Sequence, residues 1–163
     1  MPNTHYATSP LAGASLLTTS TSANFKLGTR VLGTDNTEWV YVVSSGAITQ
    51  YQCVGINEDH DAFAMTTALS VQSDRVGFAQ NAFGAGEYGW VAIAGSNIKV
   101  RTKASAAADA QLWTTASAGV LDDATAASAL KIDGVVLVSA AGTAANGAAG
   151  IEVKAAWPAI RES

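Results

Sequence analysis

The sequence contains few of the residues from which enzymes and metal sites are usually built. It has a single cysteine and two histidines in 163 residues. Cys53 alone can form neither an intramolecular disulfide nor a zinc site made of cysteine pairs. A catalytic triad would have to use His5 or His60, and no Gly-x-Ser-x-Gly turn precedes a helical pattern. We therefore expect a protein that is not an enzyme and that holds no cofactor or metal.

Charged residues are also scarce, at 13% of the chain against about a quarter in an average globular protein. The net charge is −4, and the nine lysines and arginines are scattered singly from Lys26 to Arg161. Binding to DNA or RNA normally needs a basic patch, so the sequence argues against a nucleic-acid partner. Few charges would have to be desolvated in a contact between subunits, which favours an oligomer.

Long hydrophobic runs are absent. No stretch approaches the roughly 18 apolar residues that a membrane-spanning helix needs. The chain starts with MPNTHYATSP, which lacks the basic residues of a signal peptide, and it has no Asn-x-Ser/Thr glycosylation site. These features predict a soluble protein that is made in the cytoplasm and has no membrane partner.

What the sequence does contain is a series of short segments with strand character. From Phe25 onward these segments are separated by turns rich in Gly, Asn, Asp and Ser. The clearest is Thr37 to Val43, TEWVYVV, which is rich in β-branched and aromatic residues. The expected strands are 26–32, 37–43, 48–56, 62–65, 75–80, 87–94, 97–103, 111–115, 130–138 and 151–157.

This pattern predicts an all-β fold, a compact barrel or sandwich of about nine or ten short strands with little helix. At 163 residues the chain is long enough for one domain with a real core. The last third is lower in complexity, and we expect residues 104–110 to form a connection and residues 141–150 an exposed loop. No internal repeat can be aligned.

Residues 1–24 differ from the rest because they contain no Lys, Arg, Asp or Glu. A segment of this composition buries too little surface to become ordered by itself. It is either a frayed tail or an arm that orders on a partner, with Tyr6, Leu11, Leu16 and Leu17 as its apolar anchors and candidate contact residues. We therefore divide the chain into a flexible or extended N-terminal arm, residues 1–24, and a single β-rich domain, residues 25–163.

Three short motifs invite a chemical interpretation. Residues 84–89, GAGEYG, match the G-x-G-x-x-G pattern of dinucleotide sites, but that motif must lead into a helix and here leads into the strand-like YGWVAIA. Residues 58–61, EDHD, form either a solvated turn or a weak site for a divalent cation. Asp122 and Asp123 are adjacent, whereas the paired carboxylates of glycosidases face each other. None of the three predicts a catalytic or cofactor site.

The four tryptophans raise the possibility of sugar binding, because exposed rings can stack on sugars. They are Trp39, Trp90, Trp113 and Trp157. We favour a role as anchors of the core or of a subunit interface, since three of them lie in or at the end of expected strands. Exposure of Trp39 or Trp113 beside polar residues would favour sugar binding instead.

Three segments, read together, resemble small head-associated proteins of tailed phages. They are FKLGTRVLGTDNTEWVYVVSSGAITQY (25–51), RVGFAQNAFGAGEYGWVAIAG (75–95) and LWTTASAGVLDDA (112–124). Over residues 25–157 the chain is similar to capsid decoration, or cement, proteins. Membership of that family would imply a compact β-rich domain that forms trimers on the outer shell, at three-fold or quasi-three-fold positions between capsomers. The major capsid protein would then be the partner, and residues 1–24 would correspond to an arm that orders on the shell.

The leading hypothesis is therefore a non-enzymatic virion protein that binds the outer capsid surface and stabilises the shell by bridging capsomers as a homotrimer. The alternative is a carbohydrate- or host-surface-binding β module displayed on the virion.

Overall fold

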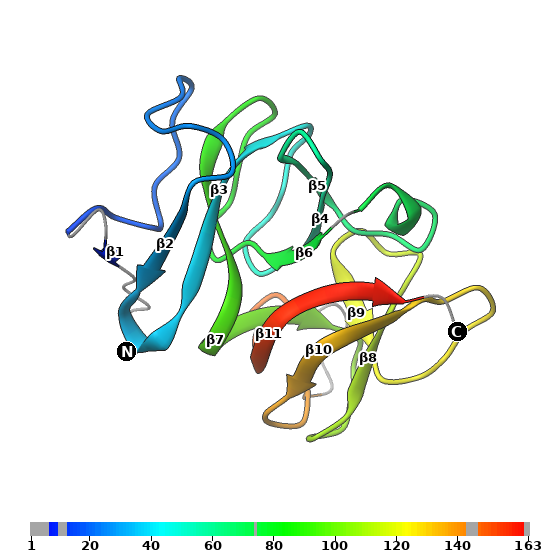
Figure 1. Ribbon diagram of the computed structural model, residues 1–163. Helices are drawn as coiled ribbons and strands as arrows, with labels where there is room; N and C mark the ends of the chain where they lie inside the picture. The colour runs from blue at the N-terminus through cyan, green and yellow to red at the C-terminus, as the bar shows by residue number, and fades with distance from the viewer. Residues whose placement is uncertain (1–6, 10–12, 74, 143–146, 162–163) are drawn as a thin grey trace.

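The regular secondary structure of the described residues is almost entirely β-strand (Figure 1). The computed structural model describes residues 7–9, 13–73, 75–142 and 147–161. In these residues it has eleven strands, two single-turn 3₁₀ helices and no α-helix. The all-β fold with little helix that the sequence predicts is confirmed. No helix in the same part of the chain is long and apolar enough to cross a membrane.

The strands range from three residues in β1 to fifteen in β7. In chain order they are β1 (Ala7–Ser9), β2 (Arg30–Gly33), β3 (Glu38–Ser44), β4 (Cys53–Ile56), β5 (Asp61–Ala64), β6 (Arg75–Phe78), β7 (Tyr88–Thr102), β8 (Gln111–Thr114), β9 (Val120–Asp122), β10 (Lys131–Leu137) and β11 (Ile151–Arg161). The 3₁₀ helices are η1 (Thr34–Asn36) and η2 (Ser70–Gln72).

Five of these strands close into a mixed barrel. β3 pairs antiparallel with β7 and parallel with β5, β4 lies between β5 and β6, and β6 returns to β7. The order around the barrel is therefore β3-β5-β4-β6-β7. Its interior is a separate hydrophobic cluster that includes Val40, Ile56 and Ile93, each at most 2% exposed.

The remaining strands, apart from β1 and β2, form a second circuit that shares β7. β7 pairs with β11, β11 with β10, β10 with β8 and β8 with β9, and the end of β7 runs parallel to β9. Counted along the chain, the first strand of each circuit is parallel to the third and antiparallel to the fifth. β3 is parallel to β5 and antiparallel to β7, and β7 is parallel to β9 and antiparallel to β11. The fold thus repeats one topology of five strands, first in β3–β7 and then in β7–β11, although the sequence shows no repeat.

β7 runs from the first circuit into the second (Figure 1). The sequence predicts two strands here, 87–94 and 97–103, and this prediction is wrong. Gly95 has a φ of +119°, and an added Cβ would lie 2.7 Å from the Asn36 carbonyl oxygen, so the bend requires glycine. The strand continues through the bend because β11 pairs with it on both sides, at Ala94 and at Ile98.

Two further strand predictions need correction. The sequence predicts no strand at 120–122, yet β9 forms there by pairing with β7 and β8. The expected strand 48–56 is reduced to Cys53–Ile56, while Ile48 makes an isolated bridge with Phe83. Both outcomes depend on partners distant in the chain, which local periodicity does not encode.

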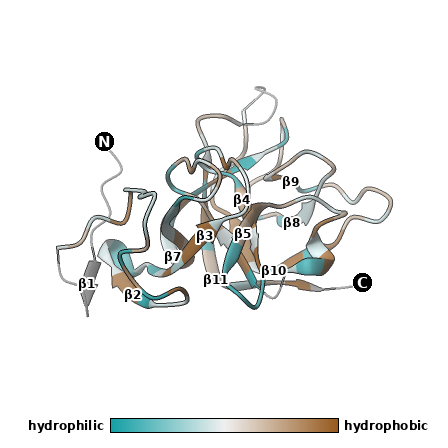
Figure 2. Ribbon diagram, turned by 90° about the horizontal axis from the view of Figure 1, so that it is seen from above, coloured by the Kyte–Doolittle hydropathy of each residue, from teal (hydrophilic) through white to brown (hydrophobic). Residues whose placement is uncertain are grey.

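Residues 13–24, the described part of the predicted arm, pack on the domain. Leu16 is 1% exposed and belongs to the same core cluster as Trp90. Ser20 and Tyr88 exchange two backbone hydrogen bonds, of 3.0 and 2.8 Å. The boundary that the sequence predicts after residue 24 is thus no structural division, because this leucine fills space beside β3 and β7. β1 and β2 lie on the same side of the molecule, away from β8, β9 and β10 (Figure 2).

A Leu16→Ala variant tests whether this segment belongs to the cooperative core. Removing a buried leucine costs its transfer free energy and leaves a cavity, so we expect the free energy of unfolding to fall by about 3 kcal/mol. Leu17→Ala, at a half-buried site, is the matched control and should cost about 1 kcal/mol or less. Urea denaturation followed by circular dichroism measures both. Equal, small losses would place Leu16 outside the core.

Candidate interaction surface

The four arm residues proposed as contacts fall into two groups. Tyr6 and Leu11 lie outside the described residues. Leu16 is buried in the domain's own core, so it has no surface to offer a partner, and its expected contact role is corrected. Leu17 is half-buried against the same cluster.

The G-x-G-x-x-G segment is a turn that leads into β7. The Gly84 N–H donates to Glu87 Oε2 at 2.8 Å, and the Glu87 N–H donates to the Gly84 carbonyl at 3.2 Å. The chain continues as a strand, so the helix N-terminus that would face a pyrophosphate is not formed. Hydrogen bonds from the Gly84 N–H and then from the Thr19 side chain lower the pKa of the Glu87 carboxyl.

The acidic segment 58–61 forms the turn between β4 and β5. The Asn57 side-chain oxygen accepts hydrogen bonds from the N–H groups of Asp59 and Asp61, at 3.1 and 2.8 Å. His60 packs against Gly28, where an added Cβ would lie 2.5 Å from the imidazole Nε2. Among the described residues no three His, Cys, Asp or Glu side chains are grouped closely enough to hold a metal ion. The segment therefore acts as a structural turn in this fold.

The two adjacent aspartates hold different parts of the backbone. Asp123 Oδ2 accepts a hydrogen bond from the Ala107 N–H at 2.8 Å, and Asp122 Oδ1 accepts one from the Ala124 N–H at 3.4 Å. Each carboxylate thus stabilises a turn. Cys53 is fully buried in β4, and this burial strongly raises the pKa of its thiol, which keeps the sulfur protonated.

The tryptophans separate clearly by exposure. Trp39 and Trp90 are buried in the core, as the sequence predicts, and Trp113 is half-buried. Trp157 is 62% exposed, so the prediction that it is an anchor of the core is wrong. That it anchors a subunit interface stays a prediction. Exposure of Trp39 or Trp113 would have favoured sugar binding, and Trp39 does not meet this condition because it is buried.

A bulge in β11 explains why Trp157 points outward. Across the β10–β11 ladder, Asp133 pairs with Ala159 and Val135 pairs with Ala155, so residues 156–158 lie opposite the single Gly134. Gly134 has a φ of +80°, and an added Cβ would lie 2.7 Å from the backbone oxygen of Ala156. The bulge therefore needs a glycine at this position of β10.

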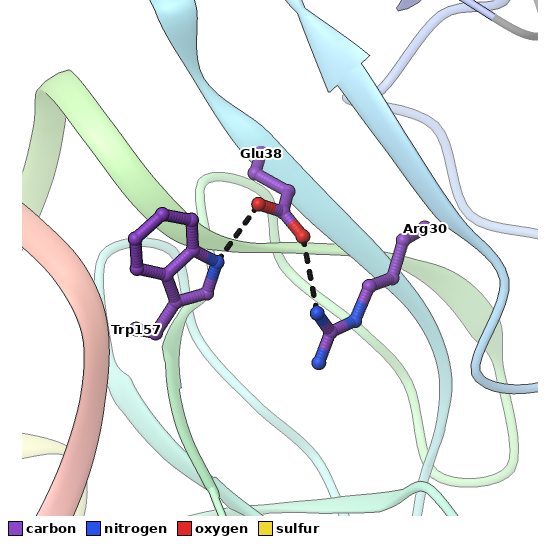
Figure 3. Close-up of polar contacts among 3 residues, drawn as sticks. All are labelled: Arg30, Glu38 and Trp157. Carbon is purple, nitrogen blue, oxygen red and sulfur yellow. Dashed lines mark hydrogen bonds and ion pairs between the residues drawn. The ribbon is translucent and has the colours of Figure 1, made fainter.

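The exposed indole is held in place by a hydrogen bond (Figure 3). Trp157 Nε1 donates to Glu38 Oε2 at 2.8 Å. The second oxygen of the same carboxylate, Oε1, pairs with Arg30 Nη1 at 3.3 Å. Glu38 thus bridges β11 and β2 from the first residue of β3, and it fixes one edge of an otherwise exposed ring.

Trp157 lies at the rim of a groove of about 410 Å³. We name it the Trp157 groove; its lining residues are Arg30, Arg75, Val76, Ile93, Trp157, Pro158 and Ala159. It lies where β6 and β7 separate from each other, since the described pairing between these two strands is limited to Phe78 and Ala92. Its lining is apolar apart from two guanidinium groups.

A second hollow of about 730 Å³ lies at η2. It is lined by Thr66, Thr67, Ala68, Val71, Ala116, Ser128 and Leu130. It contains no charged residue and no exposed aromatic ring, so it offers less chemical selectivity than the Trp157 groove.

Sequence reasoning missed the groove, although one signal was present. Gly134 interrupts the strand pattern LKIDGVVLV, and an isolated glycine in a strand is typical of a bulge. Pro158 follows Trp157 within the opposite strand, where a proline is tolerated at a bulge or an edge. That these two irregular sites face each other emerges only from the pairing of β10 with β11.

The hydrogen bond between Trp157 and Glu38 can be tested by hydrogen exchange. In Glu38→Ala the indole N–H loses its acceptor, so we expect its exchange rate to rise severalfold. The indole of Trp39, which donates to Thr37 Oγ1 at 2.7 Å, is the internal control and should keep its rate. Nuclear magnetic resonance spectra of the indole N–H signals measure both. An unchanged rate for Trp157 would contradict the contact.

The turn at Glu87 makes a prediction about pH. Because the pKa of Glu87 is lower in the folded state than its ordinary value of 4.5, the carboxylate stabilises the fold above that pH. This contribution is lost as the pH falls through the folded-state pKa. In Glu87→Gln we therefore expect the melting temperature to fall less steeply with acidification below pH 4.5. Thermal melts across that range would show identical slopes if the turn did not depend on the charge.

Comparison with known proteins places the chain in no family. No protein-family model matches the sequence, and no curated protein does.

Proposed function

We propose that this protein is a non-enzymatic structural component of a phage virion, which binds the outer capsid surface and stabilises the shell by bridging capsomers. The observation that carries the proposal is the resemblance of residues 25–157 to capsid decoration proteins. It is supported by an exposed surface suited to a partner, in which Trp157 is 62% and Leu32 54% exposed. Both residues lie next to Glu38. Leu32 is directly opposite Glu38 in the β2–β3 pair, and Trp157 donates its indole N–H to the Glu38 carboxylate.

Such surfaces fit a protein that adheres to another protein. Large aromatic side chains exposed beside arginines are typical of the centre of protein interfaces. The low content of charged residues, 13%, keeps the cost of desolvating polar groups small when a large area is covered. Tyr6 and Leu11 remain candidates for further contacts with the shell.

Such a protein would stabilise a shell because its binding is coupled to shell assembly. A protein that binds only the assembled lattice lowers the free energy of that lattice relative to separated capsomers. A homotrimer presents three copies of one modest contact, and the effective concentration of the second and third contacts makes the whole attachment strong. The proposed location is the outer surface of the virion, after synthesis in the host cytoplasm, and the partner is the major capsid protein.

A second function, binding of carbohydrate or of a host surface, is favoured by one observation. Trp157 presents an exposed indole beside the ion pair of Arg30 and Glu38. A ring in that setting can stack on the apolar face of a sugar. A glycan-binding screen that gave saturable binding dependent on Trp157, together with no binding to shells, would favour this function over the first.

The proposed function is tested by adding the purified protein to phage heads that lack their decoration protein. We expect saturable co-sedimentation with the heads and survival of the heads at a higher temperature, because bound protein adds free energy only to the intact lattice. Replacing both Tyr6 and Leu11 by alanine should weaken binding to the heads. Absence of saturable binding by the unmodified protein would refute the proposal.

A further inference from the structure

The Trp157 groove combines an exposed aromatic ring with an unbalanced positive charge. Trp157 is 62% exposed, whereas the other apolar lining residues are largely covered: Val76 and Ile93 are 1% and 2% exposed, Pro158 is buried and Ala159 is half-buried. Burying such a ring against an apolar group of a partner gains free energy in proportion to the area covered.

The two arginines of the groove are not equivalent. Arg30 is paired with Glu38 at 3.3 Å, so its charge is already balanced. Arg75 is exposed, and its guanidinium forms no ion pair within the described part of the chain. The groove therefore carries about one net positive charge, on a protein whose overall charge is −4. A ligand that complements it brings a negative group to Arg75.

The site is already arranged for binding. Glu38 accepts the indole N–H of Trp157 and so fixes the ring before any ligand arrives. The bulge opposite Gly134 fixes the backbone that carries the ring. Side chains that are held in the bound geometry lose less conformational entropy when the ligand binds.

The polar groups of the groove also indicate what kind of ligand it takes. Among its lining residues the only polar side chains are the two arginines, and no amide, hydroxyl or carboxylate side chain lines it. A sugar would bring several hydroxyl groups that find few partners there, and unsatisfied polar groups are costly to bury. A ligand with an apolar body and one carboxylate satisfies the groove better.

We propose that the Trp157 groove binds an acidic peptide segment of a partner protein, in which a carboxylate lies next to an apolar side chain. The carboxylate pairs with the Arg75 guanidinium, whose fork of donors matches its two oxygens. The neighbouring apolar side chain packs on the exposed ring of Trp157. This inference rests on the proposed function, in that the segment would belong to the capsid protein.

The probe is a pair of capped pentapeptides, glycine-leucine-aspartate-leucine-glycine and the same peptide with asparagine in place of aspartate. Both are titrated into the full-length protein while the backbone amide signals of the groove residues Arg75, Val76 and Ala159 are followed by nuclear magnetic resonance, a readout that Trp157→Ala retains. The variants are Arg75→Gln, which removes the charge, and Trp157→Ala, which removes the ring. Lys154→Gln removes an exposed charge elsewhere on β11, and Val71→Ala removes an exposed apolar group in η2.

We expect the aspartate peptide to bind weakly, with a dissociation constant of about 1 mM, as suits one contact of a multivalent attachment. The asparagine peptide and Arg75→Gln should each weaken binding by about threefold to tenfold, and added salt should remove this difference. Trp157→Ala should weaken it by about tenfold or more. Lys154→Gln and Val71→Ala should leave it unchanged. Because the exposed Arg75 makes no ion pair with any other described residue, its variant remains informative even if Trp157→Ala unfolds.

Three results would overturn the inference. The first is equal binding of the two peptides, and the second is equal loss with the control variants. The third is tighter binding of a glucuronic-acid oligosaccharide than of the aspartate peptide, which would assign the groove to glycans. The sedimentation assay separates this inference from the proposed function. Saturable shell binding that Arg75→Gln and Trp157→Ala leave intact would reject the groove as the contact and keep the function.

Discussion

Backbone hydrogen bonds to β7 hold the two halves of this molecule together. β3 and β6 pair with its first half, and β11 and β9 pair with its second half. Ala94, just before the bend, pairs with both Glu38 and Ala156, so β3, β7 and β11 meet at one point. The bend at Gly95 lets one strand follow both the barrel and the second circuit, and its positive φ and the nearby Asn36 carbonyl leave no room for a side chain there.

The candidate interaction surface is a consequence of that arrangement. β11 pairs with β7 on one side and with β10 on the other. In its pairing with β10, residues 156–158 form a bulge opposite Gly134. The bulge turns Trp157 into solvent beside the first residue of β3, where Glu38 holds its indole. A ring fixed next to a partly balanced pair of arginines is a surface that complements an acidic and apolar partner.

The structure gives the described part of the N-terminal segment a role in the core. Residues 13–24 complete the body, because Leu16 is buried beside the aromatic side chains of β3 and β7. In the proposed capsid function, contact with the shell therefore depends on residues that precede this segment and on the Trp157 groove. The body and the contact surface are thus less separate than the composition of residues 1–24 indicates.

The sequence by itself determined the fold class, most strand positions and the burial of Trp39 and Trp90. Alternation of apolar and polar residues and the turn residues between strands are local signals, and they act whatever the partner strand is. Only the tertiary structure decided that β7 is continuous, that β9 exists, that Leu16 is buried and that Trp157 is exposed. Each of these depends on which distant strand lies alongside, because hydrogen-bond ladders and bulges are properties of strand pairs. The groove was hidden for the same reason, since its arginines and its tryptophan come from β2, β6 and β11.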